Sequence, residues 1–153
     1  MKKYFVLVAI AATILFSISS CDNKEDDELD LTTEITGNYN GTITDSVIAV
    51  TSSDYTNERI SITKINNSNV QISAVGNGVL TSFSAEVSET TGGLMLTVSP
   101  QTSGATNIYG YSIPVNGVTA HGLYKTSTQE FVSAIRIVGS GGTIIETFIG
   151  AKE

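Results

Sequence analysis

Short stretches rich in β-branched and aromatic residues, separated by turns of glycine and asparagine, make up the chain from Thr36 onward. Glycine and asparagine adopt positive φ at low cost, which tight hairpin turns require. Apolar and polar residues alternate in residues 60–63 and 70–73, as expected for strands with one buried face. After residue 35 no stretch keeps helical spacing between caps. The pattern therefore predicts an all-β fold.

The turns divide this region into eight or nine expected strands, at a spacing of roughly 8–12 residues. The expected strands are residues 38–50, 57–65, 69–75, 79–89, 94–99, 107–115, 118–124, 130–138 and 143–150. Hairpin-length connections between them predict an antiparallel up-and-down β-barrel of about eight strands, with a β-sandwich as the alternative. We favour the barrel because closure removes exposed strand edges. Pro114 is expected at an edge, a bulge or a strand end.

The start of the chain has the features of a secretory signal. Two lysines precede an uncharged apolar run over residues 4–16, and thirteen helical residues would span only about 20 Å of the roughly 30 Å hydrocarbon core of a bilayer. Residues 18–21, Ile-Ser-Ser-Cys, resemble a bacterial lipobox. This resemblance implies a signal peptide over residues 1–20 and lipid attachment, including palmitate, at Cys21. The alternative is a buried free cysteine after an ordinary N-terminal helix.

An acidic segment follows Cys21. Between Asp22 and Glu34 there are seven acids and one lysine, so we expect a disordered tether over residues 21–35 and a barrel domain over residues 36–153. The segment is either a solvated spacer or a sorting signal. Residues 24–27, Lys-Glu-Asp-Asp, resemble the export signal of Bacteroidota surface lipoproteins, which implies a lipid anchor in the outer membrane, facing the cell exterior. In proteobacterial sorting, Asp22 would instead imply retention at the inner membrane.

The first expected strand carries a second resemblance. Residues 35–43 contain Gly37, Tyr39 and Gly41 ahead of an alternating strand, and they resemble the opening of calycin-like, that is lipocalin-like, β-barrel domains of small Bacteroidota lipoproteins. Residues 122–124 and 147–152 resemble the end of such domains. The resemblance implies an antiparallel barrel with a lumen and no shared catalytic residues. True lipocalins have tryptophan where Tyr39 stands, and this chain contains none.

Composition argues against several functions. Eight basic and fifteen acidic residues give a net charge of −7, whereas a nucleic-acid partner requires a clustered basic face. A zinc site needs several histidine or cysteine ligands, and the chain offers only one histidine and no second free ligand of this kind. The Gly-x-Ser-x-Gly motif of serine hydrolases is also absent from the sequence. We therefore expect no enzyme activity, cofactor or metal site. The acids of the barrel region are interpreted as solvated strand charges: Asp45, Asp54, Glu58, Glu86, Glu89, Glu130, Glu146 and Glu153.

Aromatic residues are the best candidates for ligand contacts. Tyr109 and Tyr111 flank Gly110, so on a regular strand their rings share one face. The candidate ligand-binding residues are Tyr109, Tyr111, Tyr124, Phe148 and His121, with core filling as the alternative for each. We expect a lipid-anchored, non-catalytic binding or structural module of unknown ligand. A lumenal carrier of a small apolar ligand and an accessory subunit of a larger outer-membrane complex are the alternatives.

Overall fold

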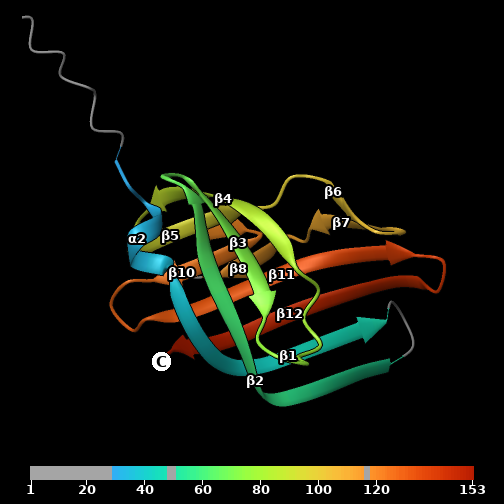
Figure 1. Ribbon diagram of the computed structural model, residues 1–153. Coiled ribbons are helices and arrows are strands. Elements are labelled where there is room, and N and C mark those ends of the chain that lie inside the picture. The colour runs from blue at the N-terminus through green and yellow to red at the C-terminus, as the bar shows by residue number, and fades with distance from the viewer. Residues whose placement is uncertain (1–28, 48–50, 116–117) are drawn as a thin grey trace, which may run out of the picture.

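The structure, a computed structural model, describes residues 29–47, 51–115 and 118–153. Within them it contains one short helix and twelve strands (Figure 1). The elements are α2 (Thr32–Ile35), β1 (Gly37–Val47), β2 (Thr51–Asn66), β3 (Asn69–Ala74), β4 (Phe83–Thr90), β5 (Gly93–Thr97), β6 (Gln101–Ser103), β7 (Thr106–Gly110), β8 (Ile113–Val115), β9 (Val118–Ala120), β10 (Gly122–Lys125), β11 (Glu130–Gly139) and β12 (Gly142–Lys152). The predicted signal peptide and Cys21 lie outside the described residues.

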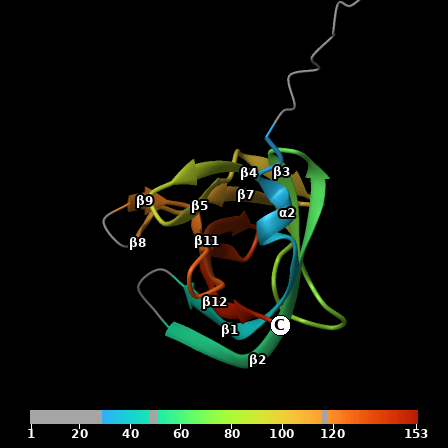
Figure 2. The same ribbon diagram turned by 90° about the vertical axis from the view of Figure 1, so that its left-hand side faces the viewer.

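Eight of the strands form an antiparallel ring. The sheet runs in the order β10-β5-β4-β3-β2-β1-β12-β11, and β10 also pairs with β11, which joins the two ends. Figure 2 shows these strands surrounding a common interior. Strands that follow one another in the chain are neighbours in the ring, apart from the insertion of β6–β9 between β5 and β10. The prediction of an all-β, antiparallel, barrel-like fold is confirmed.

The ring is not evenly closed. β10 pairs with only the first four residues of β11, Glu130 to Ser133. Further along the same edge, β11 pairs with β7 instead, and β7 pairs with β6. β8 and β9 form a separate two-stranded sheet. The barrel therefore has a well-paired end near α2 and a looser end at the β1–β2 and β11–β12 hairpins (Figure 1).

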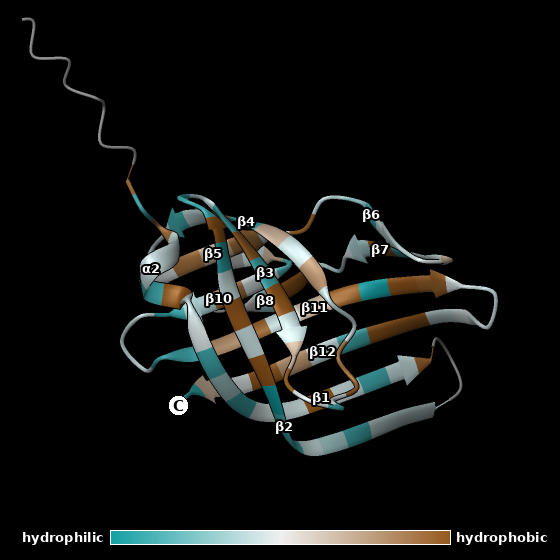
Figure 3. Cartoon of the chain, viewed as in Figure 1, coloured by the Kyte–Doolittle hydropathy of each residue, from teal (hydrophilic) through white to brown (hydrophobic). Residues whose placement is uncertain are grey.

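Inward-facing side chains fill the ring. Strands alternate between apolar and polar residues, as the colours of β2 and β11 show in Figure 3. The Phe131 ring lies 5.5 Å from the Tyr39 ring and 6.0 Å from the Phe148 ring, between centroids. The largest fully buried side chains are Tyr39, Tyr124, Phe83, Phe131, Phe148, Ile35, Ile43, Ile60, Ile62, Ile72, Leu96 and Ile108. Close packing of these aromatic and branched residues forms the core.

The ordered domain begins before residue 36, where the sequence analysis places the end of the tether. Ile35 and Thr32 of α2 are fully buried, and the Tyr39 hydroxyl donates a hydrogen bond to the Ile35 carbonyl oxygen at 2.5 Å. Asp30 forms an ion pair with Lys64 of β2. Local charge predicted disorder here, but the apolar face of α2 packs onto the end of the barrel. Among the described residues no helix is long and apolar enough to cross a membrane.

Several strand limits differ from those expected. The expected strand 107–115 is two strands, because the chain leaves β11 after a last bond from the Tyr111 N–H to the Ala134 carbonyl oxygen and turns into the β8–β9 hairpin. Residues 118–124 are likewise divided between β9 and β10, with His121 between them. Pro114 lies in β8, which pairs only with β9, so the expectation of an edge position is confirmed. β6 was not expected, and β2 begins six residues earlier than predicted, at Thr51.

Candidate functional site

Two of the candidate ligand-binding residues belong to the core. Tyr124 is 1% exposed and Phe148 is fully buried. The Tyr124 ring meets the Tyr39 ring edge to face, with 6.3 Å between centroids, and the Lys152 ammonium lies 6.0 Å from the Tyr124 ring centroid. For these two residues the core-filling interpretation accounts for the contacts that the structure shows.

Tyr109 and Tyr111 lie at the end of β7 and just beyond it. Tyr109 is opposite Arg136 of β11, whose guanidinium carbon lies 5.0 Å from the ring centroid. This cation–π contact occupies one face of the Tyr109 ring. Tyr111 is 40% exposed and follows the end of β7, so regular strand alternation does not relate the two rings. Of the candidate aromatic residues, Tyr111 offers the most accessible ring.

His121 has a structural position. Its Nδ1 accepts a hydrogen bond from the Val98 backbone N–H at 2.9 Å, so in this arrangement Nδ1 carries no proton. Its own backbone bonds to both neighbouring strands, through the Leu96 carbonyl oxygen and the Ala134 N–H. The imidazole covers Gly110, where an added Cβ would lie 2.1 Å from Nδ1. His121 therefore joins the end of β5 to the end of β7.

A buried glutamate with an aspartate opposite it is the chemically most unusual feature of the described chain. Asp45 of β1 and Glu146 of β12 are directly opposite in the antiparallel register, and Glu146 is only 3% exposed. Glu146 Oε1 accepts the Thr81 backbone N–H at 3.0 Å. Asp45 is only partly buried, but its Oδ1 atom is buried and has no hydrogen-bond partner among the described residues. Glu146 lies inside the ring and bonds to the segment that joins β3 to β4.

Burial controls the protonation of this pair. Loss of hydration raises the pKa of Glu146 to about 8, the hydrogen bond from the Thr81 N–H partly opposes this shift, and the nearby Asp45 charge adds to it. Burial also raises the pKa of Asp45. Both shifts favour the neutral form of each carboxyl group over its charged form. In the part of the chain that the structure describes, no group of three or more His, Cys, Asp or Glu side chains is placed to hold a metal.

The sequence analysis missed this pair, and its interpretation of Glu146 as a solvated strand charge is wrong. Glu146 shares strand parity with Ile144 and the buried Phe148, so alternation in β12 directs it inward. That parity was available in the sequence. The position of Asp45 opposite it was not, because the register between the first and last strands of the ring is set only by the fold.

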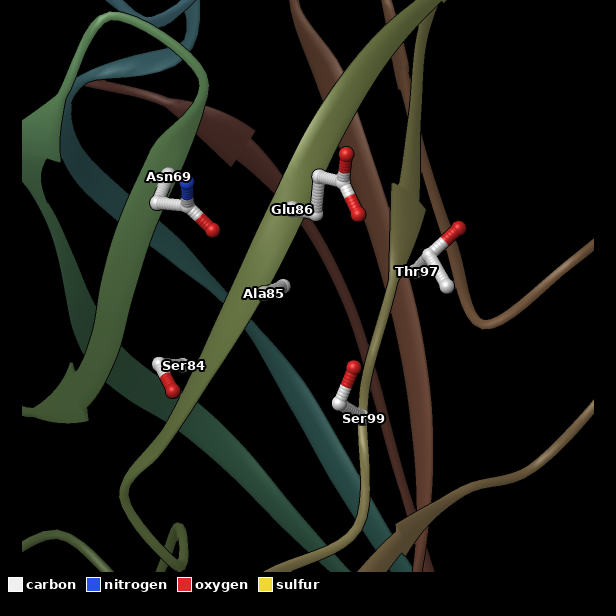
Figure 4. Close-up of a pocket in the computed structure, with 6 residues that line it drawn as sticks. All are labelled: Asn69, Ser84, Ala85, Glu86, Thr97 and Ser99. Atoms are coloured by element: carbon white, nitrogen blue, oxygen red, sulfur yellow. The ribbon is translucent and has the colours of Figure 1, made fainter.

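Two small hollows lie on the surface. The first holds about 90 Å³ between β4 and the chain after β5, and its lining is almost wholly polar (Figure 4): Asn69, Ser84, Ala85, Glu86, Thr97 and Ser99. Beside it, the Gln101 side-chain amide exchanges two hydrogen bonds of 2.9 Å with the Ser84 backbone, in place of a neighbouring strand. The second holds about 250 Å³ beside the β11–β12 turn and includes Ile137 and Ile144 in its lining. Both are open to solvent.

These features define an all-β protein built on an antiparallel ring of eight strands with a filled interior. A scan against protein-family models finds no match to this chain, and a search of curated proteins likewise finds none.

Proposed function

We propose that this chain is a lipid-anchored protein of the cell envelope whose barrel is a non-catalytic binding or structural module that acts through its surface. The observation that supports a surface role is the filled interior. Tyr39, Phe131 and Phe148 lie in contact across the ring and are fully buried. A carrier of a small apolar ligand requires a large apolar cavity in that place. The lumenal-carrier alternative is therefore less favoured.

The anchor rests on the sequence of residues 18–21 and on the acidic segment after Cys21. Both resemble features of Bacteroidota surface lipoproteins, and residues 35–43 resemble the first strand of calycin-like barrel domains. We accordingly propose an outer-membrane location facing the cell exterior. Two or three acyl chains at Cys21 would hold the protein stably, because one chain binds a bilayer only reversibly.

The place where the tether joins the domain supports an orientation. The described chain begins beside α2, and the β11–β12 hairpin lies at the other end of the ring (Figure 1). A lipid anchor on Cys21 would hold the α2 end closer to the membrane and present the hairpin end to other molecules. This arrangement fits a binding module or an accessory subunit of a larger surface complex.

Radiolabelled palmitate tests the anchor. We expect the full chain to incorporate label in its native host and the Cys21→Ala variant to incorporate none. Added protease should then degrade the labelled protein on intact cells. A wild-type chain without label would overturn the lipid anchor, and a labelled chain that is protected until the cells are broken would overturn the outward-facing location alone.

A further inference from the structure

Half of β2 is an open sheet edge. The ladder between β2 and β3 begins at Ile60, and one further bond joins the Val75 N–H to the Arg59 carbonyl oxygen at 2.9 Å. Among the described residues, 51–58 pair only with β1. Residues 51–57 are all exposed. Figures 1 and 2 both show this part of β2 at the border of the sheet, with no strand beyond it.

The fold itself opens this edge. After β3 the chain turns at Gly76, where φ is 72°, and leaves β2 instead of continuing beside it. It then runs to the interior, where Leu80 is buried and the Thr81 N–H bonds to Glu146. The segment after β3 therefore passes the Glu58 side chain at Gly78 and, among the described residues, does not pair with residues 51–57.

The edge pairs with β1 on its inner side and lacks the lysine and proline residues that block pairing at many natural edges. Its ladder with β1 is continuous from Thr51 to Thr56, and the Thr44 hydroxyl donates a hydrogen bond of 2.8 Å to Asp54 Oδ1. Natural proteins block such edges with lysine, proline or bulges. Residues 51–58 contain no lysine or proline, and the bulge at Asn57, with φ of 60°, lies only at the inner end of the edge.

The charge around the edge selects the partner. Asp54 and Glu58 lie on this part of β2, and residues 42–47 and 51–58 contain no basic residue. Arg59, the next residue along β2, is already paired with Glu153. A second copy of the chain paired edge to edge would bring these acids against their own counterparts, which is unfavourable.

We propose that residues 51–57 of β2 bind an extended, lysine- or arginine-bearing segment of another protein, which adds to the sheet as a further strand. Main-chain hydrogen bonds to the open edge supply affinity in this mode of recognition, and alternate side chains supply specificity. The inference specifies a partner for the proposed surface module. It uses residues of the barrel alone and stands independently of lipid attachment.

The test uses the full chain in detergent and three labelled peptides of about ten residues, a length that matches a typical strand. The first alternates lysine with valine, the second replaces lysine with glutamate, and the third keeps the lysines but replaces the valines with proline. Fluorescence anisotropy measures affinity, and hydrogen-exchange mass spectrometry locates the contact. We expect only the lysine–valine peptide to bind well and to slow amide exchange in residues 51–57, by about tenfold.

The proline peptide carries the same charge but cannot form a ladder, so it separates strand addition from simple attraction to the acidic tether. The matched variants are Asp54→Asn at the edge and Glu89→Gln on β4, which each remove one charge from an exposed residue. We expect a several-fold loss of affinity for Asp54→Asn and no change for Glu89→Gln.

Equal affinity for the lysine–valine and proline peptides, equal losses in the two variants, or slowed exchange outside residues 51–57 would overturn the proposal. Slowed exchange of residues 51–57 that grows with protein concentration in the absence of peptide would assign the edge to a second copy of the chain. Because binding is measured without reference to acylation, failure of palmitate labelling would overturn the anchor and leave this result intact.

Discussion

At the scale of single residues, the direction in which a side chain points decides its chemistry. Glu130 is partly exposed, and its contacts with Lys125 and Thr128 lower the pKa of its carboxyl group. Glu146, on the neighbouring strand, points inward, and burial raises its pKa to about 8. The same residue type therefore has a lowered pKa at the surface in β11 and a raised pKa in the interior in β12.

The raised pKa of Glu146 predicts a pH-dependent stability. In the unfolded chain this carboxyl group loses its proton near pH 4.5, whereas in the folded chain it keeps the proton up to about pH 8. Between these values the folded state binds more protons, so the free energy of unfolding falls as pH rises, by about 1.4 kcal/mol per pH unit at most. Glu146→Gln cannot ionise and keeps an oxygen acceptor for the Thr81 N–H. Urea unfolding at pH 5 and pH 8 should show a smaller loss of stability for this variant.

The exposed Glu89 offers the control, because Glu89→Gln makes the same chemical change at the surface. Its unfolding curves should depend on pH as those of the wild-type chain do. If Glu146→Gln also kept the full pH dependence, burial would not be the cause.

Contact between Gly110 and His121 predicts a second effect at this scale. A Cβ at residue 110 would lie 2.1 Å from His121 Nδ1, so Gly110→Ala must displace the ring that accepts the Val98 N–H. We expect Gly110→Ala to destabilise the fold by about 1–3 kcal/mol. In a His121→Ala background the same substitution should lower the free energy of unfolding by a smaller amount, because the obstructing ring is absent. A double-mutant cycle by urea unfolding measures this coupling, and strict additivity would contradict it.

At the scale of elements, the first and last strands of the ring meet at two opposed glycines. Gly41 of β1 faces Gly150 of β12 in the register. A Cβ on Gly150 would lie 2.6 Å from the Asn40 carbonyl oxygen, and one on Gly41 would lie 2.2 Å from the Ile149 carbonyl oxygen. The absence of side chains at this pair allows β1 to bend closely over β12, next to the bulge between Gly41 and Thr42.

We therefore expect Gly150→Ala to lower the free energy of unfolding by about 1–3 kcal/mol, because backbone atoms of β1 would have to move. Gly141→Ala is the matched control, since nothing lies within 4 Å of a Cβ there. It should leave stability almost unchanged. Thermal unfolding of both variants checks the comparison, and equal transition temperatures would show that the close approach carries no energetic cost.

The attachment of α2 predicts a further effect at this scale. Ile35 is fully buried at the end of the barrel, whereas Leu29, six residues earlier, is 63% exposed. Ile35→Ala should cost about 2–5 kcal/mol of stability, because it leaves a cavity in the core. Leu29→Ala shortens a side chain of similar size that is exposed to solvent, so it should change stability by less than about 0.5 kcal/mol. Urea unfolding that showed equal effects would mean that α2 does not contribute to the core.

At the scale of the whole molecule, the filled ring predicts that the protein retains no small apolar ligand. A native mass spectrum of the full chain should give the same mass as a spectrum taken under denaturing conditions, because no lumenal molecule is held by contacts alone. A small molecule that is present in the native spectrum and lost on denaturation would contradict this expectation and favour the carrier alternative.

Much of the fold was predictable because its signals are local. Alternation in 60–63 and 70–73 lies within β2 and β3, and the glycine turn at Gly92 joins β4 to β5 with positive φ. The points where expected strands are interrupted were less predictable. The expected strand 107–115 ends early because β11 pairs with β7 only as far as Gly110 before the chain leaves the sheet. Of the candidate site residues, the core positions of Tyr124 and Phe148 agree with the core-filling alternative.

The sequence by itself determined the class of fold and its antiparallel character, since turn residues and strand periodicity act over a few neighbours and need no distant contact. Only the tertiary structure decided which strands close the ring, that Asp45 lies opposite Glu146, and that residues 51–58 of β2 pair on one side alone among the described residues. These features depend on contacts between residues as far apart as β1 and β12. Their register follows from packing the whole interior at once, which no short segment encodes.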